Sequence, residues 1–144
     1  MLVYQISYRY KEFPDLRRLV IDLDGTLTIE DPGVPYADKL PDPGVVEKVR
    51  EYRRQGFEIV IATSRNMRTY ASSVGKINAH TLPTIIDWLR KHDIPYDEIH
   101  VGKPWCGTDG FYVDDRSIRP EEFRTLGYDQ IRRLLHMDGA PGDQ

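Results

Sequence analysis

The stretch Leu19-Val-Ile-Asp-Leu-Asp-Gly-Thr-Leu-Thr28 decides the fold of this 144-residue chain. Its apolar run, Leu19 to Ile21, stops abruptly at Asp22, and Asp24 and Gly25 follow. A run this short is typical of a strand buried on both faces. Asp22 and Asp24 then lie on the same side of an extended backbone, where they repel each other unless a divalent cation intervenes. The alternative is a strand followed by an Asp-Gly hairpin turn.

Three more short apolar runs end in polar residues further along the chain. They are residues 57–62 before Thr63, residues 99–101 before Gly102-Lys103-Pro104, and residues 111–113 before Asp114-Asp115. Any one of these endings occurs often by chance. Four of them, each at the carboxyl end of a plausible strand, indicate a common site, because ligands of parallel α/β sheets bind beyond that end of the strands.

Helical patterns alternate with these strands. Residues 43–55 and 81–92 carry apolar side chains at helical spacing, and shorter helices are predicted over residues 120–126 and 130–137. The alternation of strands and helices predicts an α/β fold with a mainly parallel sheet and right-handed crossovers.

The segment Asp22-Leu-Asp-Gly-Thr26 resembles the first motif of the haloacid dehalogenase-like phosphatases. Thr63, Lys103 and the pair Asp114-Asp115 resemble the other three motifs of that superfamily, in the same order. The resemblance implies a three-layer Rossmann-like core with a mainly parallel sheet. It also implies a minimal cap domain or none, because no span between the motifs is long enough to fold as a separate lid.

The resemblance implies four catalytic residues. Asp22 would attack the phosphorus and become an aspartyl-phosphate, and Asp24 would protonate the leaving oxygen and then deprotonate the attacking water. Thr63 would donate a hydrogen bond to a phosphoryl oxygen. Lys103 would place a positive charge against both Asp22 and the phosphoryl group.

Mg²⁺ is the cofactor that the resemblance implies. Its ligands would come from Asp22, from Asp24 through the backbone carbonyl, and from the pair Asp114 and Asp115. Asp114 is the expected direct ligand, whereas Asp115 is expected to orient Lys103 or a metal-bound water. The sequence leaves open which of the two contacts the metal.

Residues beside the motifs are expected to bind the substrate: Thr26, Ser64, Arg65 and Asn66. Arginine suits a second phosphate or a carboxylate on the substrate. Ser64 is also an alternative to Thr63 as the donor to the phosphoryl group. In the opposing interpretation, Asn66 caps a helix and the neighbouring arginines face solvent.

A closer resemblance, over roughly residues 19–123, is to the small subgroup of capsule-biosynthesis phosphatases. The matching segments are residues 63–70, 81–83, 88–89, 94–99, 102–107 and 110–115. The subgroup implies a small sugar or polyol phosphate in capsule or surface-polysaccharide biosynthesis as substrate. A phosphotransferase and a catalytically silent binding module are the alternatives. A dehalogenase is disfavoured, because Asp24 occupies the acid/base position that those enzymes lack.

Composition limits the partners and the compartment. The net charge is −3 and the basic residues are dispersed, which argues against a nucleic-acid partner. No apolar run approaches the about 20 residues that span a bilayer, and the N-terminus lacks the pattern of a secretory signal, so no membrane partner is expected. Cys106 is the only cysteine, which fits a reducing cytoplasm.

The length predicts one domain over residues 1–144, with an N-terminal extension over 1–18 and a disordered tail over 138–144. In the extension, the apolar side chains of Tyr4 to Tyr10 alternate with polar ones, as in a half-buried strand. An aromatic strand edge of this kind often serves subunit contacts, and an open site on a small substrate needs a cover. We therefore expect a homo-oligomer in which a neighbour helps to shape the site.

Overall fold

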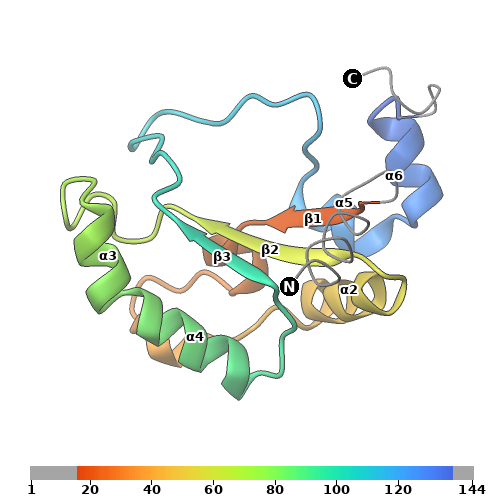
Figure 1. The fold of residues 1–144 in the computed structure, drawn as a ribbon. Coiled ribbons are helices and arrows are strands. Elements are labelled where there is room, and N and C mark those ends of the chain that lie inside the picture. The colour runs from red at the N-terminus through yellow and green to blue at the C-terminus, as the bar shows by residue number, and fades with distance from the viewer. Residues whose placement is uncertain (1–15, 138–144) are drawn as a thin grey trace, which may run out of the picture.

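A computed structural model describes residues 16–137, which form a parallel three-stranded sheet with helices packed on it (Figure 1). The strands are adjacent in chain order: β1 (Arg18–Ile21), β2 (Glu58–Thr63) and β3 (Glu98–Val101). The helices are α2 (Pro43–Arg54), α3 (Val74–His80), α4 (Leu82–Lys91), α5 (Pro120–Thr125) and α6 (Tyr128–Leu134). Within residues 16–137 no helix combines the length and the apolar character needed to cross a bilayer.

One face of the sheet is covered by α2 and α4, which lie on the same side of the strands (Figure 1). Register pairs Leu19 with Ile59 and Ile21 with Ile61, so these four side chains point toward the helices together. Ile59 and Ile61 are fully buried there, in one cluster with residues of both helices. Burial of each such side chain contributes roughly 1.5–3 kcal/mol, which makes this face the main source of stability.

Local signals fix both ends of α2, and the predicted helix over residues 43–55 is confirmed. Asp42 caps its first turn by accepting hydrogen bonds from the backbone N–H groups of Gly44 and Val45, at 3.1 and 3.2 Å. The chain leaves the helix at Gly56, whose φ of +93° few other residues adopt. The predicted helix over residues 81–92 is confirmed as α4, and the predicted strands over 57–62 and 99–101 match β2 and β3 within one residue.

Aromatic side chains fasten the C-terminal helices to α2. Tyr52 of α2 stacks on Phe123 of α5 at a centroid distance of 5.5 Å, and meets Tyr128 of α6 edge-on at 6.0 Å. An ion pair of 2.8 Å between Arg124 and the capping residue Asp42 joins α5 to the start of α2. These contacts hold the end of the described chain beside the sheet.

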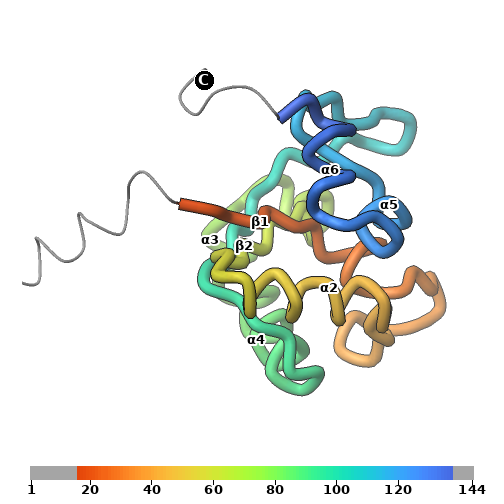
Figure 2. Tube along the Cα trace, turned by 90° about the vertical axis from the view of Figure 1, so that its right-hand side faces the viewer, coloured from red at the N-terminus to blue at the C-terminus, as the bar shows by residue number. Residues whose placement is uncertain are grey.

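The opposite face of the sheet carries no helix comparable to α2 and α4 within the described residues, and Figure 2 shows the segment after β3 running past it. Six residues of this face line a hollow of about 530 Å³ that reaches Lys103: Arg18, Val20, Val60, Ala62, Glu98 and His100. An ion pair between Arg18 of β1 and Glu98 of β3 crosses above β2. Among residues 16–137, helices α2 and α4 therefore cover one face of the sheet, and no comparable helix covers the other.

The predicted strand over residues 111–113 is wrong. Phe111 and Val113 are 80% and 89% exposed, in a long loop that leaves the sheet after Lys103 (Figure 1). Pro104 has no N–H to continue the β3 ladder, and the Tyr112 hydroxyl donates to the Pro104 carbonyl instead. The segment is apolar, as expected of a strand, but strand formation also requires a neighbouring strand, which local sequence does not specify.

One helix has no counterpart among the predicted elements, and two predicted segments lie outside the described residues. Helix α3 was missed; its start was signalled by Ser73, whose hydroxyl accepts a hydrogen bond from the Lys76 N–H. The predicted strand from Tyr4 to Tyr10 and the predicted tail over residues 138–144 lie outside the described residues.

Candidate active site

The turn that follows β1 presents both carboxylates of the first motif. Asp22 ends the strand in an extended conformation, and the Thr28 N–H donates to the Leu23 carbonyl at 3.0 Å, which closes a wide turn. Gly25 adopts φ +79°, as the predicted tight turn requires. Leu23 and Leu27 are fully buried and anchor the turn in the core. Asp22 and Asp24 are left at the surface.

Asp22 is the more accessible of the two carboxylates, with a side chain 35% exposed. Its Oδ1 lies 3.5 Å from Lys103 Nζ, and its Oδ2 accepts a hydrogen bond from the Thr26 hydroxyl at 3.2 Å. Burial raises the pKa of the Asp22 carboxyl above its usual value, against the opposing effects of Lys103, the Leu23 N–H and Thr26. The structure therefore brings Asp22, Thr26 and Lys103 together.

Lys103 reaches Asp22 from the end of β3. Its backbone N–H donates to the Thr63 carbonyl at 3.2 Å, which ties the start of the loop to the end of β2. Gly102 turns the chain with φ +85°, and a Cβ there would lie 2.9 Å from Val74 Cγ2 of α3. The ammonium also lies over the Tyr112 ring, 4.5 Å from its centroid.

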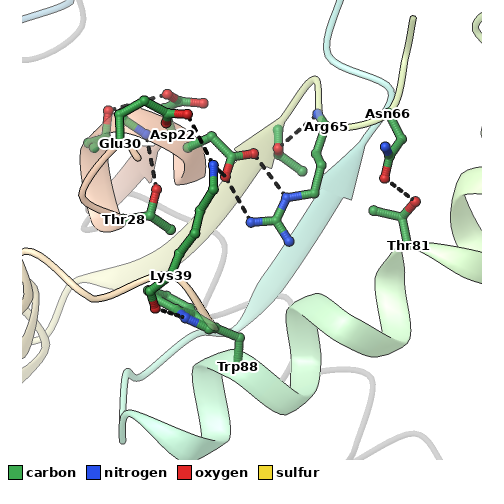
Figure 3. Close-up of polar contacts among 12 residues, drawn as sticks. Asp22, Thr28, Glu30, Lys39, Arg65, Asn66, Thr81 and Trp88 are labelled. Atoms are coloured by element: carbon green, nitrogen blue, oxygen red, sulfur yellow. Dashed lines mark hydrogen bonds and ion pairs between the residues drawn. The ribbon is translucent and has the colours of Figure 1, made fainter. Parts of the chain in front are cut away.

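Asp24 is bound by two cations, Arg65 and Lys39, both of which are labelled in Figure 3. Arg65 makes a bidentate pair with it: Nε donates to Oδ2 at 2.9 Å and Nη2 donates to Oδ1 at 2.8 Å. Lys39 Nζ lies 3.5 Å from Oδ1 and 3.1 Å from Glu30 Oε1. Two cations and two carboxylates thus form a charge-balanced cluster, which we call the Asp24 cluster: Asp24, Glu30, Lys39 and Arg65.

The Asp24 cluster is packed as well as paired. The ring of Tyr36 lies 4.2 Å from the Arg65 guanidinium carbon and 4.7 Å from Lys39 Nζ. The indole N–H of Trp88, in α4, donates to the Lys39 carbonyl at 2.8 Å (Figure 3). The side chains of Lys39 and Arg65 are consequently only 5% and 1% exposed.

The remaining predicted residues of the second motif are turned toward the protein. Thr63 is buried, and its hydroxyl accepts a hydrogen bond from the Arg65 backbone N–H at 3.1 Å. Asn66, at φ +62°, donates through its side-chain amide to Thr69 and accepts from Thr81 at 2.7 Å. Ser64 is partly buried at the start of this turn. Phosphoryl binding by Thr63 and substrate contacts by Thr26, Ser64, Arg65 and Asn66 stay predictions.

Asp114 and Asp115 are not brought to the other motifs. Both are exposed, in the loop between β3 and α5. Asp114 accepts a hydrogen bond from the Arg116 N–H at 2.8 Å, and this bond lowers the pKa of its carboxyl. Within residues 16–137 no three His, Cys, Asp or Glu side chains gather closely enough to hold a metal ion together, and Asp114 does not join Asp22 and Asp24. The carboxylates as arranged here therefore do not fit the expected Mg²⁺ site.

Sequence reasoning missed two members of the Asp24 cluster, Lys39 and Glu30. Both lie in a proline-rich connection where neither periodicity nor spacing marks a charged residue as buried. The ring of Tyr36 lies against the Lys39 ammonium, and Trp88, 49 positions away, binds the Lys39 carbonyl, which is a contact that local sequence does not specify. Tyr36 stands out in the sequence only as an aromatic residue that could stack on a ligand.

Comparison with known proteins agrees with the geometry. A model of the haloacid dehalogenase-like hydrolase family matches residues 19–86, which contain both carboxylates, the Asp24 cluster and Thr63. The crystal structure of a target protein from Vibrio cholerae is 55% identical, covers 86% of this chain and 100% of its own, and has a TM-score of 0.82. Over residues 19–86 the chain carries a haloacid dehalogenase-like hydrolase domain. Its parallel sheet is the Rossmann-like core of that family, with a minimal cap.

Two other solved structures are more distantly similar to this hydrolase. A Pnkp1/Rnl/Hen1 complex is 21% identical, with 69% of this chain and 31% of that chain covered and a TM-score of 0.47. The D,D-heptose 1.7-bisphosphate phosphatase of B. bronchiseptica, complexed with magnesium and phosphate, is 17% identical, with 85% and 65% covered and a TM-score of 0.44. Neither likeness carries an argument about this hydrolase. A comparison with curated proteins found no match.

The raised pKa of Asp22 predicts a stability effect of Asp22→Asn. A carboxyl whose pKa is higher in the folded than in the unfolded state stabilises the fold when protonated, and this contribution is lost as pH rises through the folded pKa. At pH 7 the neutral amide avoids that loss. The Asn variant should therefore melt at the same or a higher temperature than the wild type at pH 7, and the difference should shrink as the pH approaches 4. Thermal melts followed by circular dichroism at both pH values check this; a variant clearly less stable at pH 7 would contradict it.

Proposed function

We propose that this hydrolase is a phosphomonoester phosphatase that works through an aspartyl-phosphate on Asp22. The observation that carries the proposal is the unequal treatment of two neighbouring carboxylates. Asp22 is partly exposed beside one cation, Lys103, whereas Asp24 is held by Arg65 and Lys39. Pairs of acids in contrasting environments are typical of sites where one acts as nucleophile and the other transfers protons.

In the first step, an oxygen of the Asp22 carboxylate bonds to phosphorus while the bond from phosphorus to the leaving oxygen breaks. The leaving oxygen takes its proton from Asp24. Lys103 lies 3.5 Å from Asp22 and would balance the negative charge of the approaching phosphoryl group. Tyr112 stacks on the ammonium and supports that position.

In the second step, water attacks the phosphorus and gives one proton to Asp24. The bond between phosphorus and the Asp22 oxygen then breaks, which releases inorganic phosphate and restores the carboxylate. Asp24 thus regains the proton that it gave up in the first step, and the cycle closes without a further reactant.

Mg²⁺ stays a proposed cofactor on the ground of the sequence resemblance. When bound in a site of this kind, the ion would reduce the repulsion between the Asp22 carboxylate and the phosphoryl group. Asp22, the Asp24 carbonyl and Asp114 are the proposed donors. The loop that carries Asp114 lies elsewhere here, so no step above depends on the metal.

The proposed substrate is a small sugar or polyol phosphate of capsule or surface-polysaccharide biosynthesis, in the cytoplasm. The resemblance to the capsule-biosynthesis phosphatases supports the substrate class, and the lone Cys106 fits the compartment. Aromatic surface for a sugar ring is offered by Tyr36 and Trp105, which are both exposed. We also propose a homo-oligomer whose neighbour helps to cover the site, and light scattering that finds a fully active monomer at assay concentration would exclude it.

Asp22→Asn tests the function. The substitution keeps the shape of the side chain and removes the attacking charge, so phosphate release from an aryl phosphate should fall by at least about 1000-fold. Folding is checked by circular dichroism, and Asp31→Asn, in the surface loop after Glu30, is the matched control. A well-folded Asn variant within tenfold of wild-type turnover would show that Asp22 is not the nucleophile. A wild-type protein that releases no phosphate from any ester would point to a silent binding module.

The metal proposal makes a separate prediction. A chelator should abolish turnover, Mg²⁺ should restore it, and Ca²⁺ should restore it poorly, because its longer and looser coordination misplaces the carboxylate. Asp114→Asn should raise the Mg²⁺ concentration needed for half-maximal rate more than Asp115→Asn does. A Mg²⁺ titration of the two variants gives the order, and the reverse order would exchange their assignments.

A further inference from the structure

The two oxygens of the Asp24 carboxylate face different surroundings. Oδ1 lies 2.8 Å from Arg65 Nη2 and 3.5 Å from Lys39 Nζ, whereas Oδ2 lies 2.9 Å from Arg65 Nε alone. Each carboxylate oxygen has about two lone-pair sites. Among residues 16–137, then, each oxygen accepts one hydrogen bond from Arg65, and the second cation, Lys39, lies on the side of Oδ1 only.

Both cations are held in place by contacts other than Asp24. Tyr36 covers them from one side, at 4.2 Å from Arg65 and 4.7 Å from Lys39. Glu30 binds Lys39 at 3.1 Å, and Trp88 fixes the Lys39 backbone through its carbonyl. These contacts do not depend on the charge of Asp24, so both side chains stay in place when Asp24 carries the proton.

Arg65 is also badly placed to bind a substrate itself. Its side chain is 1% exposed, and its third nitrogen, Nη1, is buried without a hydrogen-bond partner among the described residues. An unpartnered buried donor is tolerated only where stronger contacts fix the group. The bidentate pair with Asp24 and the ring of Tyr36 are those contacts.

We propose that Arg65 and Lys39 are positioning residues that make Oδ2 of Asp24 the oxygen that carries the catalytic proton. The proposal rests on the phosphatase function proposed above. In the first step the proton on Oδ2 passes to the leaving oxygen as its bond to phosphorus breaks. In the second step Oδ2 receives a proton from the water whose oxygen bonds to phosphorus. The cations hold Oδ1 throughout and keep the carboxylate from rotating toward Asp22.

The acidity of the leaving group separates this role from a purely structural one. An alkoxide is a poor leaving group and needs the proton, whereas a dinitrophenolate leaves without it. Loss of proton positioning should therefore slow the cleavage of alkyl phosphates much more than that of activated aryl phosphates. A general loosening of the site would slow both alike.

The experiment compares Lys39→Met and Arg65→Met with the wild type on a series of alkyl and aryl phosphates. For alkyl phosphates kcat should fall about 100-fold, the usual size of a proton-transfer contribution, with KM changed by less than about threefold because neither cation contacts the substrate. With dinitrophenyl phosphate, a burst of dinitrophenolate should precede slow turnover, because Asp22 still becomes phosphorylated while the attack of water is impaired. Arg65→Lys should recover part of the alkyl phosphatase activity.

Controls keep the outcomes distinct. Arg54→Met removes an arginine that pairs with Glu47 on the surface of α2 and should leave every rate unchanged. If Arg65→Met does not fold, as judged by circular dichroism, Lys39→Met and Tyr36→Leu decide, and both should show the same dependence on the leaving group. Equal losses in the rate of leaving-group release across the series, or none, would overturn the proposal, whereas a wild type inactive on every ester would overturn the phosphatase function itself.

Discussion

Repulsion between two carboxylates on one turn is the constraint that organises this site. Asp22 and Asp24 lie on the one turn that follows β1, and burial, with a smaller contribution from the charge of Asp24, raises the pKa of Asp22. Two unit charges about 4 Å apart cost roughly 1–4 kcal/mol near a protein surface, which is a large share of the stability of a small domain. The chain reduces this cost by giving each acid its own cations.

The parallel sheet makes that assignment feasible. Lys103 follows β3 and Arg65 follows β2, so both start from the same edge of the sheet as the carboxylates. Lys39 comes from the irregular connection after the turn, and its carbonyl accepts a hydrogen bond from Trp88 of α4. The cations that pair with Asp22 and Asp24 therefore come from separate segments of the chain, which only the tertiary structure brings together.

Sequence reasoning predicted the local features well. The strand before Asp22, the turn at Gly25 and the helices α2 and α4 follow from short-range patterns, and the structure contains all of them. It also pointed to Lys103 as the partner of Asp22, through the resemblance to a family. It did not predict features that depend on distant partners. Residues 111–113 have the composition of a strand but do not pair with another strand here. The carbonyl of Lys39 is bound by Trp88, which lies 49 positions away. The sequence does not show that Arg65 pairs with Asp24, and the predicted contact of Arg65 with a substrate stays a prediction.

The close approach of Gly102 to α3 links the position of Lys103 to the packing of that helix. A Cβ on residue 102 would lie 2.9 Å from Val74 Cγ2, so the backbone passes close to α3, and Lys103 emerges in reach of Asp22. Neither Val74 nor Gly102 has a group that can react, yet the position of the ammonium depends on both. A helix that carries none of the predicted site residues therefore shares in placing the ammonium of Lys103.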